Sequence, residues 1–375
     1  MPAIYTPGLR VSPHTGLRYR RTLPIPGEVL VTAGQRVQAT DTVAETQMPG
    51  EVFPLSLANM LGVASSDLAR AMVVKQGDAV TAGQLLARSE SLFGLMVKDA
   101  HAPTSGTVEA ISNVTGQLML RGPARPLRVA AYLTGVVAEV LPGEGVIVAG
   151  EGTLVQGIFG IGPEAYGPLR PVCGKPHDLL DEHLLRPEHR GTIVIGGGRV
   201  TAAALEAAVR LEVSAIVTGG IDDADLRNFL GYDLGVAVTG SEKVGLTLII
   251  TEGFGDIAMA DRTYKLLTSR AGQQAACNGA TQIRAGVIRP EVIVPSSGGA
   301  TTATGGSGPV AGVLAVGAPI RLIRDPYFGL LGAVSALPAE PQWLASGAKA
   351  RVAEVKLADG RTIVAPRANL ELVEE

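Results

Sequence analysis

The sequence predicts a multidomain protein that combines β-rich parts with an α/β part. Three observations favour this fold class: hairpin-like runs fill residues 21–165, strand and helix patterns alternate over residues 191–295, and short apolar runs follow a glycine-rich stretch near the end. A chain of 375 residues has room for about two to four domains. Apolar residues make up 46% of it, enough to fill several cores, so disorder is not expected.

Changes of pattern place the expected domain boundaries. They predict an extended leader (1–20), a β-rich domain (21–165), a connector (166–190), a parallel α/β domain (191–295), a flexible linker (296–309) and a small β-barrel (310–375). The linker reads SSGGATTATGGSGP, and as a flexible coil it would span roughly 20 Å on average. Such a linker would tether the last domain without fixing its orientation.

The clearest fold signal lies in residues 73–112. Short apolar runs are separated there by Gly77-Asp78 and Gly83-Gln84, and such pairs indicate hairpins because they tolerate the positive φ of tight turns. The pattern V-x-x-G-D-x-V-x-x-G-Q-x-L-A, followed by A-P-x-S-G-T-V, resembles the barrel-sandwich hybrid of biotinyl and lipoyl carrier domains. The sequence is most similar to the barrel-sandwich hybrid in the C subunit of Rnf-type electron-transport complexes. The resemblance implies a barrel-sandwich hybrid in the β-rich domain.

The resemblance does not extend to the carrier chemistry. A carrier domain presents one lysine at the tip of the hairpin between the two halves of this pattern. Counting from either half places Phe93 or Leu95 at that tip, and Lys98 is out of register. We therefore expect no biotinyl or lipoyl cofactor, and we expect the β-module to have a structural role.

Two further segments repeat the hairpin pattern. The first begins at Gly27 and has Ala33-Gly34-Gln35 where the main stretch has Gln76-Gly77-Asp78; the second covers residues 135–148. Repeats of this size predict strands that stack on one another to bury their apolar faces. We expect three related β-units in one rigid domain, with one or two short helices within residues 55–71.

From residue 191 the pattern becomes that of an α/β domain. Predicted strands cover residues 192–195, 213–217, 235–239, 246–250 and 291–294, and predicted helices cover residues 201–211, 222–230 and 258–271. Thr201 and Asp222 are suitable helix N-caps. The alternation of strands and helices predicts a parallel sheet.

Three glycine-bearing loops follow predicted strands of this sheet. At the carboxyl edge of a parallel sheet, such loops feed helix N-termini that attract anions. The candidate ligand-binding residues are Gly196, Gly197, Gly198, Thr218, Gly219, Gly220, Thr251, Gly253 and Gly255. The alternative is that the glycines make tight turns and nothing more. Neither a GxGxxG nor a GxxxxGK[ST] motif supports a nucleotide here.

No complete catalytic or metal-binding motif is present. Glu252 is the one weak candidate for a general base. In the connector, His177 and His183 lie six residues apart and would face different sides of a helix, so no metal site is expected. Cys173 and Cys277 form no disulfide framework. Whether the protein is an enzyme stays open.

The last domain carries a second family pattern. Residues 317–334 have a Gly, an alternating apolar strand, a Gly at a turn and a Gly-x-Val return, and they resemble the KOW motif of NusG-like transcription factors and ribosomal proteins. The resemblance implies an SH3-like barrel that contacts RNA or a protein partner. Asp359-Gly360 predicts a hairpin within it. The candidate contact residues are Arg321, Arg324, Tyr327, Phe328 and Arg367.

Bulk properties narrow the class of protein. The net charge is −3, which argues against a dominant nucleic-acid surface. The start lacks a signal-peptide pattern, and no apolar run approaches the roughly 20 residues that span a bilayer. We expect a cytoplasmic protein without a membrane partner.

Three functions stay open at this point. The first is a non-enzymatic adaptor or scaffold whose KOW-like barrel contacts RNA or the transcription–translation machinery. The second is an α/β enzyme or sensor that binds a small anion or phosphate at the glycine edge. The third is a self-assembling structural subunit, for which a homo-oligomer is the natural form.

Overall fold

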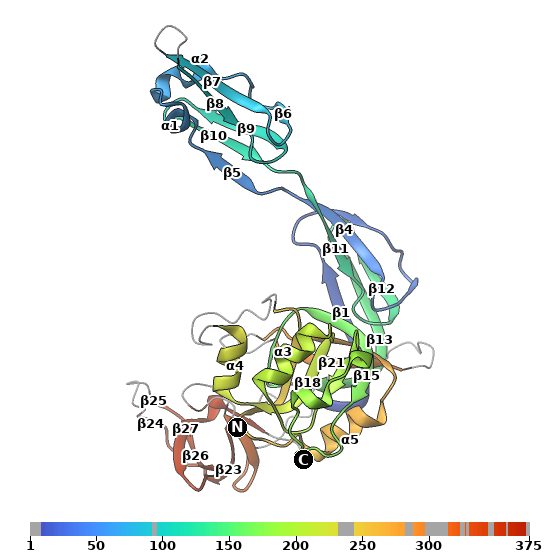
Figure 1. The fold of residues 1–375 in the computed structure, drawn as a ribbon. Coiled ribbons are helices and arrows are strands. Elements are labelled where there is room, and N and C mark those ends of the chain that lie inside the picture. The colour runs from blue at the N-terminus through green and yellow to red at the C-terminus, as the bar shows by residue number, and fades with distance from the viewer. Residues whose placement is uncertain are drawn as a thin grey trace.

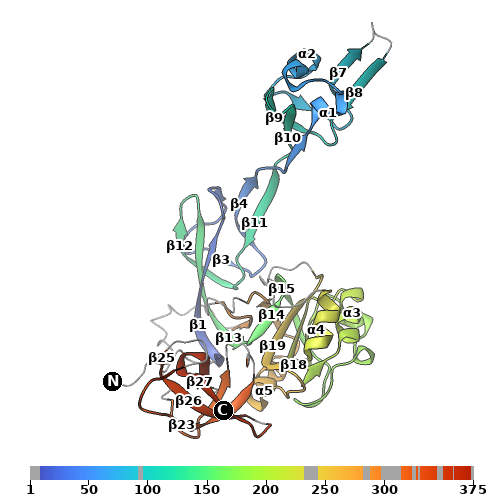
Figure 2. The ribbon, with the colours of Figure 1, turned by 90° about the vertical axis from the view of Figure 1, so that its left-hand side faces the viewer.

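The chain forms a long molecule with three levels (Figures 1 and 2). A computed structural model describes residues 9–91, 96–231, 244–281, 288–296, 314–322, 327, 330–343, 349–357 and 359–372. We call residues 49–124 the distal module, residues 11–48 and 125–156 the proximal unit, and residues 157–296 the body. The distal module stands at one end, the proximal unit lies in the middle, and the body with the C-terminal strands forms the other end.

The distal module is a small β-structure with short helices at one side. Its elements are β5 (Val52–Leu55), α1 (Leu57–Leu61), a 3-10 turn (Ser65–Asp67), α2 (Leu68–Ala71), β6 (Ala79–Val80), β7 (Leu85–Ser91), β8 (Met96–His101), β9 (Gly106–Ser112) and β10 (Gln117–Arg121). One sheet has the order β5-β10-β9-β6, and β7 pairs with β8. Leu57, Leu86 and Leu118 are fully buried in its core. The helices lie in the segment for which the sequence predicts them.

The proximal unit is formed by strands from both sides of the distal module. They are β1 (Val11–Thr22), β2 (Glu28–Val29), β3 (Arg36–Val37), β4 (Thr42–Met48), β11 (Arg125–Ala130), β12 (Gly135–Leu141) and β13 (Gly145–Gln156). The predicted leader therefore includes most of β1, which pairs antiparallel with β13 from Val11↔Val155 to Thr22↔Gly145. Leu17 explains this, because its buried side chain anchors the otherwise polar strand in the core.

The proximal unit and the distal module share one hydrogen-bond pattern. In each, a glycine of the first turn donates its N–H to a valine of a neighbouring strand, and a second turn is tied to a hydroxyl. In the proximal unit these bonds are Gly34 N to Val137 O (2.8 Å) and Ala39 N to Thr134 Oγ1 (3.1 Å). In the distal module they are Gly77 N to Val108 O (2.8 Å) and Ala82 N to Ser105 Oγ (3.0 Å). The register shift between β12 and β13 beside Val137 has its counterpart between β9 and β10 beside Val108. The two parts are thus copies of one fold.

This equivalence shows how the chain is organised. The β4–β11 hairpin of the proximal unit corresponds to the β7–β8 hairpin of the distal module, and each pair carries a register shift near its base. Met48 of β4 pairs with Arg125 of β11, and the whole distal module lies between them in the sequence. The first and last of the three predicted β-units therefore combine into one proximal unit, and the distal module is inserted at the tip of its hairpin.

The body contains a β-sheet with helices on both faces. Its elements are β14 (Phe159–Ile161), β15 (Glu164–Pro171), 3-10 turns (Glu182–Leu184 and Pro187–His189), β16 (Ile193–Ile195), β17 (Arg199–Val200), α3 (Ala202–Arg210), β18 (Ala215–Ile221), α4 (Asp223–Leu230), β19 (Thr247–Phe254), α5 (Asp261–Ser269), β20 (Gln274–Asn278) and β21 (Glu291–Pro295). Thr201 and Asp222 cap α3 and α4 through their side chains, as predicted. Leu205 of α3 and Leu226 of α4 belong to one core, and Leu267 of α5 belongs to the core on the opposite face.

The sheet is mixed rather than purely parallel. Its order is β14-β19-β18-β16-β15-β20-β21-β13-β12-β3, so it runs from the body into the proximal unit. Strands β15, β16, β18 and β19 are parallel, whereas β21 is antiparallel to both β13 and β20. The segment predicted as a connector supplies most of β15, from Tyr166 to Pro171. The predicted strand at residues 235–239 and nearly all of the predicted linker lie outside the described residues.

The C-terminal strands form an antiparallel sheet against the body. They are β22 (Pro319–Leu322), β23 (Leu331–Ala336), β24 (Gln342–Trp343), β25 (Lys349–Ala350), β26 (Val352–Leu357), β27 (Thr362–Pro366) and β28 (Leu370–Leu372), with a 3-10 turn (Arg367–Asn369). The main order is β27-β26-β23-β22-β28. Val355 pairs with Ile363 across the hairpin that Asp359-Gly360 predicts. Across the described residues, no helix has the length and apolar character needed to cross a membrane.

Candidate functional site

The structure brings the predicted glycine segments together but does not form three loops. Gly219 and Gly220 lie inside β18, and Gly253 lies inside β19, where it pairs with Gly220. The strands continue through the glycines because a bare backbone lets other chain segments approach closely. A Cβ on Gly219 would lie 2.5 Å from the Met259 nitrogen, and one on Gly197 would lie 2.5 Å from the Lys175 oxygen.

The polar groups of this glycine edge are largely engaged within the protein. Five of the glycine N–H groups donate to backbone carbonyls. The bonds run from Gly196 to Val217, from Gly198 to Asp178, from Gly219 to Gly197, from Gly220 to Gly198 and from Gly255 to Ile221. The buried hydroxyls of Thr218 and Thr251 donate to the carbonyls of Gly198 and Thr218, at 2.6 and 3.3 Å. The observed arrangement supports close backbone packing. Anion binding at these residues stays a prediction.

Glu252 occupies a structural position beside this edge. It is only 6% exposed, its Oε1 accepts a hydrogen bond from the Ala260 N–H at 3.0 Å, and its Oε2 accepts one from Arg321 at 2.8 Å. Ala260 is the N-cap of α5, so the carboxylate sits at the positive end of that helix. Both oxygens are engaged, which favours a structural role over that of a general base.

Arg321 joins the C-terminal sheet to the body. This residue of β22 is 2% exposed and lies between Glu252 of β19 and Glu371 of β28, with Arg289 donating to Glu371 at 2.8 Å. Burial lowers the pKa of Arg321 and raises the pKa of Glu371. These buried ion pairs do not favour the predicted contact of Arg321 with RNA or a partner, which stays a prediction. The same contacts fix the sheet against the body.

Two other predicted contact residues, Arg367 and Tyr327, make contacts within the C-terminal sheet. Arg367 donates to the carbonyls of Val352 at 2.9 Å and Pro338 at 2.8 Å. Tyr327 packs against the apolar core of the sheet. Arg324 and Phe328 lie outside the described residues.

The cysteines and the connector histidines form no reactive cluster in the described part of the chain. There, no group of three or more His, Cys, Asp or Glu side chains gathers in a way that could hold a metal ion. Burial raises the pKa of the Cys173 thiol to about 11 and that of Cys277 to about 12. Both thiols are therefore protonated near neutral pH.

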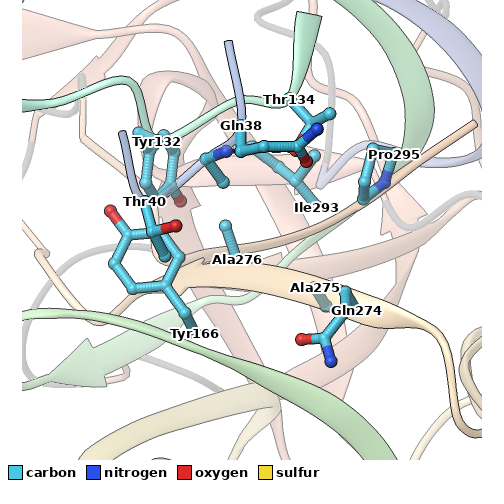
Figure 3. A pocket seen from close by; sticks show the side chains of 11 residues that line it. Gln38, Thr40, Tyr132, Thr134, Tyr166, Gln274, Ala275, Ala276, Ile293 and Pro295 are labelled. Atoms are coloured by element: carbon cyan, nitrogen blue, oxygen red, sulfur yellow. Dashed lines mark hydrogen bonds between the residues drawn. The ribbon is translucent and has the colours of Figure 1, made fainter. Parts of the chain in front are cut away.

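A pocket that the sequence did not reveal lies where the proximal unit meets the body (Figure 3). Its volume is about 230 Å³. Figure 3 shows Gln38 and Thr134 on one side and Gln274 and Ala276 on the other. The first side belongs to the two turns that the proximal unit shares with the distal module, and the second belongs to β20 of the body.

Tyr132 forms one wall of this pocket in an unusual conformation. Its φ is +64°, a left-handed value that a bulky residue rarely adopts. The backbone is held there because the Tyr132 N–H donates to the Ala39 carbonyl at 2.7 Å. The side chain is 1% exposed, and its hydroxyl donates to Glu291 Oε1 at 3.3 Å. Strained residues of this kind cluster at ligand clamps and switches, so Tyr132 marks a candidate functional position.

Charged side chains outside the pocket lining contact Tyr132 and Tyr166. Arg21 makes two bonds to Glu164, at 2.6 and 2.8 Å, and its guanidinium lies 5.2 Å from the centre of the Tyr132 ring, a cation–π distance. Tyr166 donates its hydroxyl to Glu164 at 3.1 Å. Burial raises the pKa of Tyr132 well above its usual value and also raises the pKa of Glu291. The tyrosine hydroxyls therefore stay protonated.

The internal repeat could have pointed to Tyr132. Aligning A-Y-L-T-G-V-V at residues 131–137 with A-P-T-S-G-T-V at residues 102–108 places Tyr132 opposite Pro103. A large aromatic residue in a turn whose counterpart has a proline is a visible departure. Neither the left-handed φ nor the pocket follows from the sequence, because both depend on the facing strands of the body.

Comparison with known proteins assigns one part of the chain. A family model described as the RnfC barrel sandwich hybrid domain matches residues 61–121, which lie inside the distal module. No curated protein matches the chain. The match confirms the predicted barrel-sandwich hybrid for the distal module. The proximal unit shares the turn hydrogen bonds of this module, and a barrel-sandwich hybrid there stays a prediction.

Proposed function

We propose that the protein is a non-enzymatic adaptor that displays the distal module to a protein partner. The observation that carries this proposal is the insertion of the module at the tip of the β4–β11 hairpin. The chain enters and leaves the module next to the paired residues Met48 and Arg125. In Figures 1 and 2 the module projects away from the body. A module held on two strands is accessible from most sides.

The surface of the distal module favours a protein partner. Large apolar side chains that are at least 40% exposed there are Val52, Met60, Val73, Val97 and Val114. The described part of the body, although it is larger, presents Leu179 and Ile288 in this class. Exposed apolar side chains supply the area that a protein interface buries.

The C-terminal sheet supports the adaptor in a different way. We propose that it has an SH3-like fold of the KOW type and that it acts as a fixed part of the body. Contact between this sheet and RNA has weaker support, because Arg321 is buried in an ion-pair network and Arg367 bonds to backbone carbonyls. A partner within the transcription–translation machinery would then be bound through protein contacts, in the cytoplasm.

Site-specific photo-crosslinking in cells that make the protein tests this proposal. A photoreactive residue is placed at Met60, Val73 or Val114, and a matched one at the exposed Lys265 of α5. We expect discrete crosslinks to the same protein from the three module positions and none from Lys265. Crosslinks at the Lys265 position alone, or at none of the four, would contradict the proposal.

A further inference from the structure

The pocket between the proximal unit and the body exists because the two copies of the fold have different surroundings. In the proximal unit, the turn at Gln38 faces β20 and β21 of the body across the pocket. In the distal module the corresponding turn, which starts at Thr81, is exposed, and Pro103 opposite it is exposed as well. The same pair of turns is therefore a free surface in one copy and a pocket wall in the other.

The lining of the pocket defines the polarity of a ligand. Its walls are the rings of Tyr132 and Tyr166 together with small or apolar side chains, including Ala276, Ile293 and Pro295. Hydrogen-bonding groups come from the amides of Gln38 and Gln274. Among the described residues that line the pocket, none is charged. Such a lining suits a neutral, flat molecule with a few polar atoms at its edge.

The two carboxyl groups behind the lining already have partners within the protein. Glu164 is paired with Arg21, and the partly buried Glu291 accepts a hydrogen bond from Tyr132. Neither carboxylate is among the lining residues. A charged ligand would find no opposite charge on the pocket wall, and it would lose its hydration on entering.

The volume of the pocket sets the size of the ligand. A protein cavity of about 150 Å³ takes up benzene. The pocket here has a volume of about 230 Å³, roughly one and a half times that of the benzene cavity, and it has room for two fused rings.

We propose that this pocket binds a small neutral bicyclic aromatic heterocycle. Tyr166 contacts a face or an edge of the rings, and Tyr132, which is only 1% exposed, closes the pocket behind them. The amides of Gln38 and Gln274 bond to polar ring atoms. Indole and purine bases share this chemistry, and direct comparison distinguishes them. Ligand binding at the pocket does not depend on the adaptor function of the distal module.

Saturation-transfer NMR on the full chain tests the proposal with indole, adenine and benzoate as probes. We expect transfer to indole or to adenine, and weaker or no transfer to the benzoate anion. Gln38→Trp and Gln274→Trp place an indole side chain in the pocket from opposite walls, and each should abolish the transfer. Both positions are exposed, so neither substitution disturbs a core. Thr81→Trp changes the corresponding exposed turn of the distal module and should leave the transfer unchanged.

Some results would overturn the proposal. Absence of transfer to both neutral probes would show that the wild-type pocket binds no such ring. Transfer that persists in either blocking variant at the level of Thr81→Trp would place the bound probe elsewhere. Equal transfer to benzoate would contradict the inferred neutrality of the ligand.

Discussion

The proximal unit and the distal module have one fold in two settings. Both have a first turn whose glycine, Gly34 or Gly77, donates to a valine across the sheet, and both have the same register shift beside that valine. The distal module stands free at the end of two strands, whereas β13 of the proximal unit continues into the sheet of the body. The shared fold is therefore set by local turns. The left-handed Tyr132 and the pocket arise where the body contacts the proximal unit.

Position 132 shows this most clearly. Pro103 of the distal module has its φ restricted to about −65° by its ring. Tyr132 at the equivalent place adopts a φ of +64° and reaches Glu291 of the body. This costly conformation is held by the bond from the Tyr132 N–H to Ala39 within the proximal unit and by the bond from its hydroxyl to Glu291 of the body. The pocket is thus a property of the junction and not of the barrel-sandwich fold.

The largest expected effect separates the two settings by stability. Leu120→Ala removes a fully buried side chain of the distal core, and Leu154→Ala removes one from β13. Each should cost about 2–5 kcal/mol of unfolding free energy. Hydrogen exchange should show that Leu120→Ala loosens the distal module alone, whereas Leu154→Ala loosens the proximal unit and the body together. Equal loss of protection in β13 from both variants would contradict the independence of the module.

A smaller effect concerns the strained tyrosine. Tyr132→Phe removes one of the two tyrosine hydroxyls, those of Tyr132 and Tyr19, that bond to the partly buried carboxyl group of Glu291, so urea unfolding should show a loss of about 0.5–1.5 kcal/mol. Tyr166→Phe is the matched control and should cost less, because Glu164 keeps both bonds from Arg21. If the two variants lose the same stability, the Tyr132 hydroxyl has no special role.

The pH dependence of stability should differ in sign between Glu291, where the body meets the proximal unit, and Asp99 of the distal module. Burial raises the pKa of Glu291 above its usual 4.5, so the folded chain keeps a proton that the unfolded chain releases. This contribution to stability is complete below pH 4.5 and is lost as the pH rises through the folded pKa. The stability difference between wild type and Glu291→Gln should therefore fall with rising pH in urea titrations.

The distal module provides the opposite case. A hydrogen bond from Arg88 lowers the pKa of Asp99, so its contribution is present above the usual pKa and is lost as the pH falls through the folded value. Asp99→Asn should reduce stability slightly at neutral pH and not at low pH. A rise in the relative stability of wild type with pH at Glu291, or a fall at Asp99, would show that the assigned causes are wrong.

The smallest effect tests whether the turns are equivalent. Thr134→Ala and Ser105→Ala each remove the hydroxyl that accepts a backbone N–H, from Ala39 and Ala82 respectively. Each should cost about 0.5–1.5 kcal/mol, and the two costs should agree. Thermal unfolding followed by segment-resolved hydrogen exchange measures both. A clear difference would mean that the body also supports the proximal turn.

The sequence predicted local structure better than junctions. Turn chemistry at Gly77 and Asp359-Gly360 and the caps at Thr201 and Asp222 could be recognised because each depends on neighbours in the chain. The nested arrangement could not, because it depends on which repeats pair across the inserted module. Arg321 was predicted as a contact for RNA or a partner, since nothing near it in sequence reveals that it pairs with the distant Glu252. The same limit applies to the pocket, whose walls come from distant segments.

Removing the distal module tests the nested architecture most directly. Residues 49–124 are replaced by Asn-Gly, which favours the tight turn needed to join β4 to β11. Because Met48 and Arg125 are already paired, we expect the shortened chain to keep the urea midpoint of the body and the hydrogen-exchange protection of β12 and β13. Loss of that protection, or a chain that no longer unfolds cooperatively, would show that the distal module is part of one folding unit and not an insertion.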